Sequence, residues 1–185
     1  MEVSDEQLML EYRDGNAGAF DTLYAGHKGA LFRFVLRSVR VRARAEEIYQ
    51  EVWMRVIEGR TRYRPQARFR TWLFTIAHHR LVDHWRQHEL QTLPLDDADG
   101  AAATPAAASG LQPERQAEIR ESLARLAQAI GALPTAQREA FLLQQEAGLS
   151  ASEIAAATGA GEEAVKSRLR YAMTKLRAAL ADVRA

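Results

Sequence analysis

The chain has 185 residues, 47% of them hydrophobic and 26% charged, and a net charge of +1, which describes an ordinary water-soluble protein of one domain or two small ones. It has no run of about 18 apolar residues, and its acidic beginning lacks the basic-then-apolar order of a signal peptide, so we expect neither a membrane span nor export. It has no cysteine, which excludes disulfides and thiolate chemistry and fits a cytoplasmic protein.

Residues 5–38 are expected to form two helices, separated near Asp14-Gly15-Asn16. Apolar side chains recur at spacings of three and four on both sides of this turn, as on the buried face of a helix. This is core-forming material, and we predict no functional site in it.

A third helix is predicted over about residues 43–58. Trp53 flanks its apolar side, which we assign to Ile48, Val52, Met54 and Val56. Its N-terminal half carries a polar, acidic face formed by Glu46, Glu47, Gln50 and Glu51. From the residues alone, the simplest interpretation is a solvated face, because acidic side chains suit the N-terminus of a helix.

The next segment, residues 61–88, alternates arginines with aromatic residues. Between Arg60 and Arg86 there are seven arginines and a single acidic residue, Asp83. Pro65 predicts a loop that leads into a helix starting near Phe69. Proteins that bind single-stranded nucleic acid typically place basic side chains along the phosphates and stack aromatic rings on unpaired bases. Binding of a nucleotide extruded into a loop pocket is a related possibility. The alternative is a basic surface over an ordinary core, which we favour for the aromatic rings themselves.

Four of the five histidines, His78, His79, His84 and His88, fall within this segment. Structural zinc usually takes four ligands from cysteine and histidine, often from two segments. One helix without cysteine cannot readily surround the ion. We therefore expect no metal and no cofactor.

Residues 90–113 are rich in Ala, Gly, Pro and Asp and have no helical period, so they are predicted to be a flexible linker. Its acidic residues include Asp96, Asp97 and Asp99. A helix is expected to resume at Glu114 and to pack on the elements that follow. Its apolar stripe is formed by Ile119, Leu123, Leu126, Ala127 and Ile130.

The last fifty residues have the layout of a helix-turn-helix. A helix opens at Pro134-Thr135 and ends at Gly148. Ser150 and Glu153 have the spacing of a capping box that opens a short second helix, and Gly159 suits its left-handed C-terminal residue. A basic amphipathic helix then covers residues 162–180. Its apolar stripe is formed by Val165, Leu169, Ala172, Met173, Leu176 and Leu180.

The polar N-terminal half of that basic helix is the part that would reach base edges in a major groove. Lys166, Ser167 and Arg170 share one face there, and lysine and arginine can donate to guanine acceptors. A helical hairpin with a solvated charged face is the alternative. The capping box and the paired glycines favour the DNA-binding interpretation.

Three strings resemble sigma factors, most closely the small two-domain extracytoplasmic-function (ECF) class. The C-terminal string is G-L-S-x-x-E-I-A-x-x-x-G followed by V-K-S-R-L-x-x-A-x-x-x-L-R. The other two are R-A-E-E-I-Y-Q-E-V-W at residues 44–53 and R-F-R-T-W-L-F-x-I-A-x-x-x-x-x-D-x-W-R at residues 68–86. Nearly the whole chain apart from the linker is covered.

The resemblance implies a role for each segment. Core RNA polymerase would be bound by Glu46, Glu47, Gln50 and Glu51. The −10 element would be recognised and melted by Tyr63, Arg64, Arg68, Arg70, His79 and Arg80. The −35 duplex would be read by Lys166, Ser167 and Arg170, with Arg168 and Tyr171 on phosphates.

The chain departs from the family at two places. Arg44 puts a positive charge where the family usually has Asp, and we hypothesise that polymerase binding then needs a compensating contact or an activating event. His78 and His79 stand where a basic residue and Asn are common, which affects the choice of −10 bases.

We therefore expect an all-α protein with a sigma-2-like domain over residues 1–89, a linker over 90–113 and a sigma-4-like helix-turn-helix domain over 114–185. Its expected partners are core RNA polymerase, promoter DNA and an anti-sigma or other regulatory protein, without a membrane. A conventional helix-turn-helix regulator would explain residues 133–181 equally well, but not the Arg/aromatic segment or the acidic helix. An enzyme is disfavoured, because no phosphate loop, nucleophile motif or metal cluster is present in the sequence.

Overall fold

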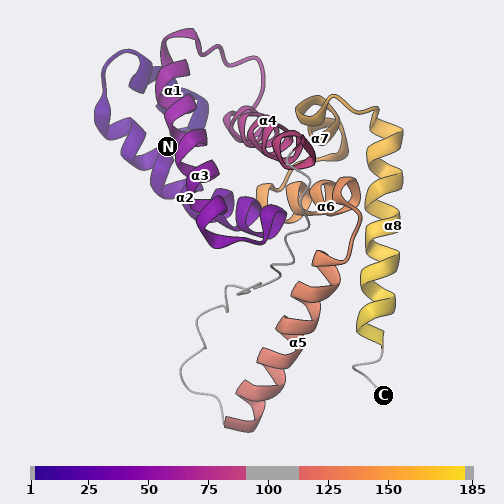
Figure 1. Cartoon of the computed structure of the whole chain (residues 1–185). Helices are drawn as coiled ribbons and strands as arrows, with labels where there is room; N and C mark the ends of the chain where they lie inside the picture. The colour runs from indigo at the N-terminus through magenta and orange to yellow at the C-terminus, as the bar shows by residue number, and fades with distance from the viewer. Residues whose placement is uncertain (1–2, 91–112, 182–185) are drawn as a thin grey trace.

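The computed structural model describes residues 3–90 and 113–181, and within them every regular element is a helix, which confirms the all-α expectation. Along the chain, one helical domain precedes residues 91–112 and the other follows them (Figure 1). The predicted linker and its three aspartates lie almost wholly outside the described residues. The helices are α1 (Asp5–Arg13), α2 (Ala17–Val39), α3 (Arg42–Gly59), the 3-10 turn η1 (Arg60–Arg62), α4 (Phe69–Leu90), α5 (Pro113–Gly131), α6 (Thr135–Ala147), α7 (Ala151–Thr158) and α8 (Glu162–Ala181).

The N-terminal domain is formed by α1 to α4 around a core of large apolar side chains. Phe34 of α2 and Phe74 of α4 are fully buried and meet edge to face, with ring centroids 5.3 Å apart. Trp53 of α3 packs against Phe20 and Tyr24, at centroid distances of 5.8 and 4.9 Å. The turn between α1 and α2 lies at residues 14–16, where the sequence predicted it.

Glu6 of α1 caps the N-terminus of α4, a helix far from it in the sequence. Its Oε1 accepts a hydrogen bond of 2.7 Å from the backbone N–H of Phe69. The first N–H groups of a helix have no partner inside the helix, and a carboxylate there also meets the positive end of the helix dipole. Burial raises the pKa of Glu6, but the hydrogen bonds from the N–H groups of Phe69 and of Glu6 itself outweigh it, and the pKa is lowered overall.

The C-terminal domain follows the helix-turn-helix layout closely. Gly148 and Gly159 end α6 and α7 with φ of 62° and 68°, values that glycine adopts without strain. The Ser150 side chain accepts from the N–H of Glu153 while the Glu153 carboxylate accepts from the N–H of Ser150, so the predicted capping box is confirmed.

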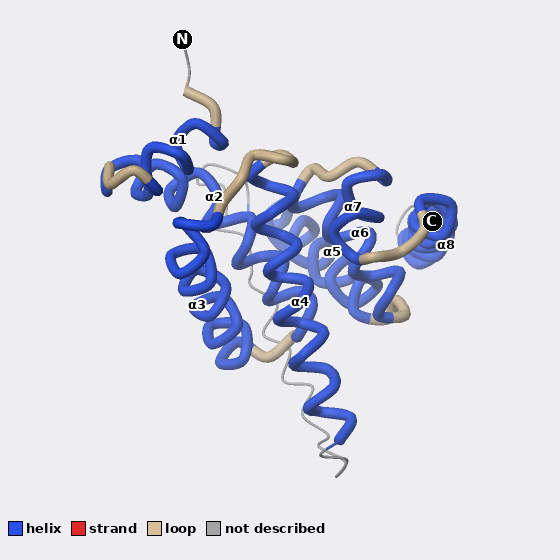
Figure 2. The backbone as a smooth tube through the Cα atoms, turned by 90° about the horizontal axis from the view of Figure 1, so that it is seen from above, coloured by secondary structure: helices blue, strands red, loops and turns tan. Residues whose placement is uncertain are grey.

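The two domains pack directly against each other. Figure 2 shows α4 between α3 on one side and α6 and α7 on the other. The buried apolar side chains of both domains form one continuous cluster, which includes Phe74 and Leu81 of α4 and Leu142 of α6. The sequence did not predict this contact, because it joins residues far apart along the chain.

Two apolar residues are more exposed than the helical spacing predicted. Met54, assigned to the apolar side of α3, is 54% exposed, because the buried stripe follows Ile48, Val52 and Val56 instead. Ile119 of α5 is 41% exposed, since the N-terminal part of α5 extends away from the body of the domain (Figure 1). Within the described residues, none of the helices combines the length and apolar character that a membrane crossing needs.

We predict that Glu6→Ala lowers the free energy of unfolding at pH 7 by about 1 kcal/mol, because the Phe69 N–H loses a charged acceptor. Glu6→Gln should cost less, since its amide oxygen can still accept. The pKa of Glu6 is lowered in the folded state, so its contribution is complete at neutral pH and is lost as the pH falls through the folded value. Urea unfolding at pH 7 and in mild acid measures both effects. Glu58→Ala, on the exposed face of α3, is the control, and an equal loss in that variant would contradict the capping role.

Candidate nucleic-acid interface

Helix α8 separates its apolar and polar faces cleanly. Val165, Leu169, Ala172 and Leu176 are buried against the rest of the domain. Lys166, Arg170 and Tyr171 are exposed, while Ser167 and Arg168 are half-buried at the edge of the same surface. The capped α7 and the glycine turn after it fix how α8 leaves the domain, and the polar face of its N-terminal half is exposed.

Neighbouring carboxylates balance the charge on this face. Lys166 Nζ lies 2.8 Å from Glu163 Oε1 and 3.0 Å from Glu162 Oε1, and the hydrogen bond to Glu163 in particular raises the pKa of Lys166. The Arg170 guanidinium lies over the Tyr171 ring at 5.4 Å from its centroid. Two carboxylates therefore already hold the Lys166 ammonium on this face.

The loop before α4 is anchored by an aromatic side chain. Tyr63 is only 2% exposed, and its ring meets those of Trp72 and Phe69 at centroid distances of 5.0 and 6.4 Å. Burial raises the pKa of Tyr63 to about 12, with Glu6 and Asp5 adding to the effect. Arg64, beside it, is exposed and donates to the Tyr63 carbonyl oxygen. The structure thus assigns Tyr63 to holding the loop and leaves the arginine on its surface.

Arg68 and Arg70 both reach the C-terminal domain. Arg68 Nη1 lies 3.5 Å from Glu153 Oε1, and the hydroxyl of Thr71 donates to the same oxygen at 3.0 Å. Arg70 Nη1 donates to the carbonyl oxygen of Ala147 at the end of α6, at 3.3 Å. Two of the arginines predicted to meet the −10 strand therefore lie in the contact between the domains.

His79 and Arg80 lie on a different face of α4 and line a shallow hollow of about 260 Å³ together with Arg55, Trp72 and Ile76. His79 is exposed, whereas Arg80 is half-buried and paired with Asp83. The structure thus places the predicted −10 residues in three settings: Tyr63 and Arg64 in the loop, Arg68 and Arg70 at the interdomain contact, and His79 and Arg80 at this hollow.

His78 is a residue whose role the sequence reasoning missed. It is buried on α4, and its Nδ1 lies 2.6 Å from Oε1 of Glu139 on α6. It was grouped with the neighbouring histidines as a weak zinc candidate. Its spacing of four from Phe74 and three from Leu81, both fully buried, is the signal that would have placed it on the inner face of α4.

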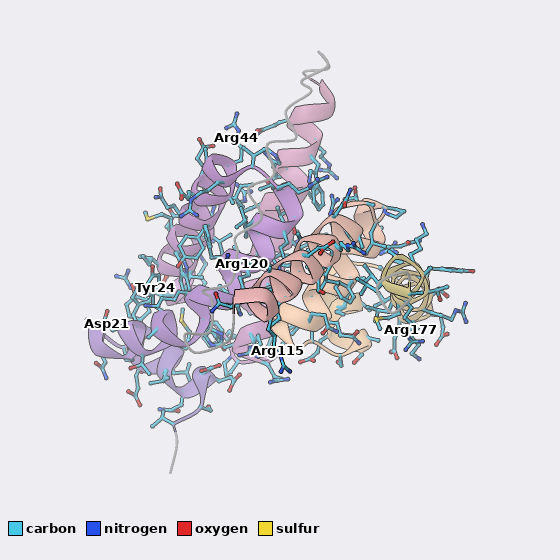
Figure 3. All side chains as sticks on the ribbon, turned by 90° about the horizontal axis from the view of Figure 1, so that it is seen from below. Asp21, Tyr24, Arg44, Arg115, Arg120 and Arg177 are labelled. Atoms are coloured by element: carbon cyan, nitrogen blue, oxygen red, sulfur yellow. The ribbon has the colours of Figure 1, made fainter. Side chains whose placement is uncertain are left out.

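The acidic face of α3 is exposed as expected, at Glu46, Glu47, Gln50 and Glu51. Two arginines on the same helix neutralise part of it. Arg44 Nη1 lies 2.7 Å from Glu47 Oε2, and Arg42 Nε lies 2.9 Å from Glu46 Oε1. Figure 3 labels Arg44 on this helix and Arg177 on α8, well apart across the molecule, so the α3 face and α8 form separate surfaces.

Among the described residues, no group of histidines and carboxylates has the arrangement of a metal site. The surfaces that remain are of two kinds, a mixed acidic face on α3 and basic faces on α4 and α8. Such surfaces suit association with large charged partners rather than bond-breaking chemistry.

Comparison with known proteins finds a family match in each of two separate regions of the chain. Residues 23–90 match the family described as Sigma-70 region 2, and residues 123–176 match Sigma-70, region 4. The chain is 31% identical to RNA polymerase sigma factor CarQ of Myxococcus xanthus, over 95% of this chain and 97% of that protein. It is 33% identical to ECF RNA polymerase sigma factor RpoE of Cereibacter sphaeroides, over 92% and 91%.

A solved structure has a similar fold over both domains. The structure of CnrH in complex with the cytosolic domain of CnrY matches with a TM-score of 0.69 and 26% identity, and covers 96% of this chain and 97% of that chain. The two family matches occur in the expected order, and the relatives match over nearly the whole length of both chains. Both findings agree with the two helical domains of the structure. The chain belongs to the ECF group of the sigma-70 family, and it is a factor of transcription initiation and not an enzyme.

Proposed function

We propose that this sigma factor binds core RNA polymerase through the acidic face of α3, reads a −35 element as duplex with α8, and reads a −10 element as melted strand with residues 63–68 and α4. The observation that carries the proposal is the exposed basic N-terminal half of α8, held by a buried apolar stripe behind a capped helix-turn-helix. The domain limits of the sequence analysis, 1–89 and 114–185, are part of this proposal.

Duplex reading needs side chains that reach base edges and others that fix the register. Lys166 and Arg170 are exposed donors one helical turn apart, and Ser167 lies beside them. These three would read bases. Arg168 and Tyr171 would contact phosphates, which position the helix without specifying sequence.

To bind an unpaired DNA strand, a protein needs basic side chains for the phosphates and aromatic side chains on which bases can stack. Arg64, Arg68 and Arg70 supply the cations around the loop, and His79 and Arg80 line the hollow on α4. Tyr63 is buried, so in this proposal it positions the loop instead of stacking on a base. Base stacking and phosphate contacts together suit an unpaired strand.

The partners follow from the family and from the charges. Core polymerase is the partner of a sigma factor, and we therefore propose that the chain acts in the cytoplasm. CnrH was solved with the cytosolic domain of CnrY, and we infer a protein partner of that kind, an anti-sigma factor, for this chain.

The direct test is transcription by bacterial core RNA polymerase with the purified chain on a randomised promoter pool. Initiation that depends on the chain, at sites with two spaced sequence elements, would support the proposal. Tight binding to a palindromic duplex without any association with polymerase would instead indicate a conventional dimeric regulator.

We predict that Arg44→Asp strengthens binding to core polymerase by roughly three- to tenfold, because it releases Glu47 and removes a positive charge from the acidic face. Fluorescence anisotropy of the labelled chain, titrated with core polymerase, measures the change. Arg55→Asp is the matched control, since Arg55 pairs with Glu58 at the same i,i+3 spacing on α3 but outside the acidic face. Unchanged affinity in Arg44→Asp, or an equal gain in the control, would show that Arg44 does not tune this contact.

We also predict different losses at two cations of α8. Lys166→Ala should cost about 1–3 kcal/mol of binding on the best −35 duplex and relax the preference at one base pair, because it removes a base contact. Arg168→Ala should weaken all sequences alike and reduce the salt dependence by about one phosphate contact. Binding selections with the polymerase holoenzyme at several salt concentrations distinguish the two, and identical sequence profiles for both variants would contradict the assignment.

A further inference from the structure

A buried histidine links α1 to the start of α4. His27 of α2 is only 2% exposed, and its Nε2 lies 2.8 Å from Oδ2 of Asp5 on α1. Its ring packs on the ring of Phe69, the first residue of α4, with the centroids 5.2 Å apart. The next residue of α1, Glu6, accepts from the backbone N–H of the same Phe69. Two adjacent carboxylates of α1 therefore join α2 and α4 at one junction.

The second ring nitrogen of His27 shows which form of the imidazole fits this junction. Nδ1 is buried and has no hydrogen-bond partner within the described residues. In neutral histidine one nitrogen donates and the other accepts, whereas both nitrogens of the protonated ring are donors. A neutral ring that donates from Nε2 to Asp5 leaves only a lone pair at Nδ1. Protonation would add a buried positive charge and an N–H without an acceptor, which costs free energy.

The charged groups that act on His27 come from α1 and α4. Burial lowers the pKa of His27, and the positive charge of Arg70 on α4 adds to this effect, while Asp5 and Glu6 on α1 oppose it. The balance leaves the pKa below its ordinary value. A loosened junction, in which the ring meets water, therefore binds the proton more strongly. The packed junction is fully stable at neutral pH and loses stability as the pH falls through the ordinary histidine value.

Phe69 connects His27 to the loop at residues 63–68. The Phe69 ring contacts the His27 ring and, at a centroid distance of 6.4 Å, the ring of Tyr63. Tyr63 and Phe69 stand at the two ends of the loop, and both are buried. Arg64 and Arg68 lie between them in the sequence, and both are exposed. The positions of these two cations therefore depend on two buried rings, one of which rests on His27.

We propose that His27 is a positioning residue for strand binding, which in its neutral form holds the loop at residues 63–68 in place for a single DNA strand and in its protonated form loosens that loop. Recognition of the −10 strand then weakens in mild acid, while duplex reading by α8, in the other domain, does not depend on this histidine. The inference rests on the proposed −10 function of the loop, whereas the contact of His27 with Phe69 does not.

The form of the His27 ring can be measured by nitrogen-15 NMR of the labelled chain, in which His27→Gln assigns the His27 signal. We expect a ring that carries its proton at Nε2 at neutral pH and that titrates below the ordinary histidine range. In Asp5→Asn it should titrate at a still lower pH, because the carboxylate that favours the charged ring is gone. A proton at Nδ1 in neutral solution, or titration at the ordinary value or above it, would overturn the proposal.

Hydrogen exchange at the backbone N–H of Phe69 measures how firmly the loop is held. Glutamine at position 27 can still donate to Asp5 but does not titrate. Between about pH 7.5 and about pH 6, protection of this N–H should fall about two- to fourfold in the unaltered chain relative to His27→Gln at the same pH. His84→Gln, the same substitution on α4 outside the junction, is the matched control and should respond like the unaltered chain. An equal response in His27→Gln would contradict the positioning role.

Strand binding is measured at the same two pH values, with the polymerase holoenzyme and a rhodamine-labelled single strand that carries a −10 sequence obtained from the promoter pool. Relative to holoenzyme with His27→Gln, that with the unaltered chain should lose about two- to fourfold in affinity in mild acid. The exposed His79 gains charge there and acts in the opposite direction, equally in both chains. Loss of protection at Phe69 without this relative loss of affinity would overturn the link to strand binding. A holoenzyme that binds no strand at either pH would instead refute the proposed −10 function, while the NMR and exchange results still decide the role of His27 at the junction.

Discussion

The structure depends on α4 being packed on both sides. One side of this helix lies in the N-terminal core, where Phe74 meets Phe34, and the other is covered by α6 and α7. Its N-terminus is held by Glu6 from α1, and its middle by the contact between His78 and Glu139. The contacts of α4 determine where the second domain lies. They also determine the shape of the loop at residues 63–68 and how far its arginines are exposed.

Several exposed basic side chains on this framework form ion pairs within the chain. Several cations on or beside the proposed contact surfaces already have acidic partners: Lys166 has two glutamates, Arg44 has Glu47 and Arg68 has Glu153. An exposed pair contributes little to stability, so exchanging it for a phosphate or a partner side chain is inexpensive. Prior pairing lowers the affinity for arbitrary polyanions, and it raises the share of binding that depends on the correct partner.

Much of this architecture could be predicted from the sequence, because its signals are local. Ser150 with Glu153, and glycines at 148 and 159, determine where short helices begin and end, and the structure has them there. The stripe of Val165, Leu169, Ala172 and Leu176 likewise predicted which side of α8 is buried. The motifs also predicted the family, since they extend over both domains.

What could not be predicted depends on residues far apart in the chain. Periodicity marks a side chain as buried but does not say which helix covers it, so His78 was not connected with Glu139. Periodicity also does not show that one domain packs against another. The sequence therefore did not predict that Arg68 contacts Glu153 of the C-terminal domain. Met54 and Ile119 fit an apolar period, yet no helix in the described structure packs over them fully.

One measurement tests most directly whether α4 serves the second domain and the promoter in turn. A chain that carries two dyes, at Asp21→Cys of α2 and Lys175→Cys of α8, would be followed by energy transfer as core RNA polymerase and then promoter DNA are added. The account predicts high energy transfer in the free chain and a fall when it enters the polymerase complex. Energy transfer that is already low in the free chain, or that stays high in a complex that initiates transcription, would contradict it.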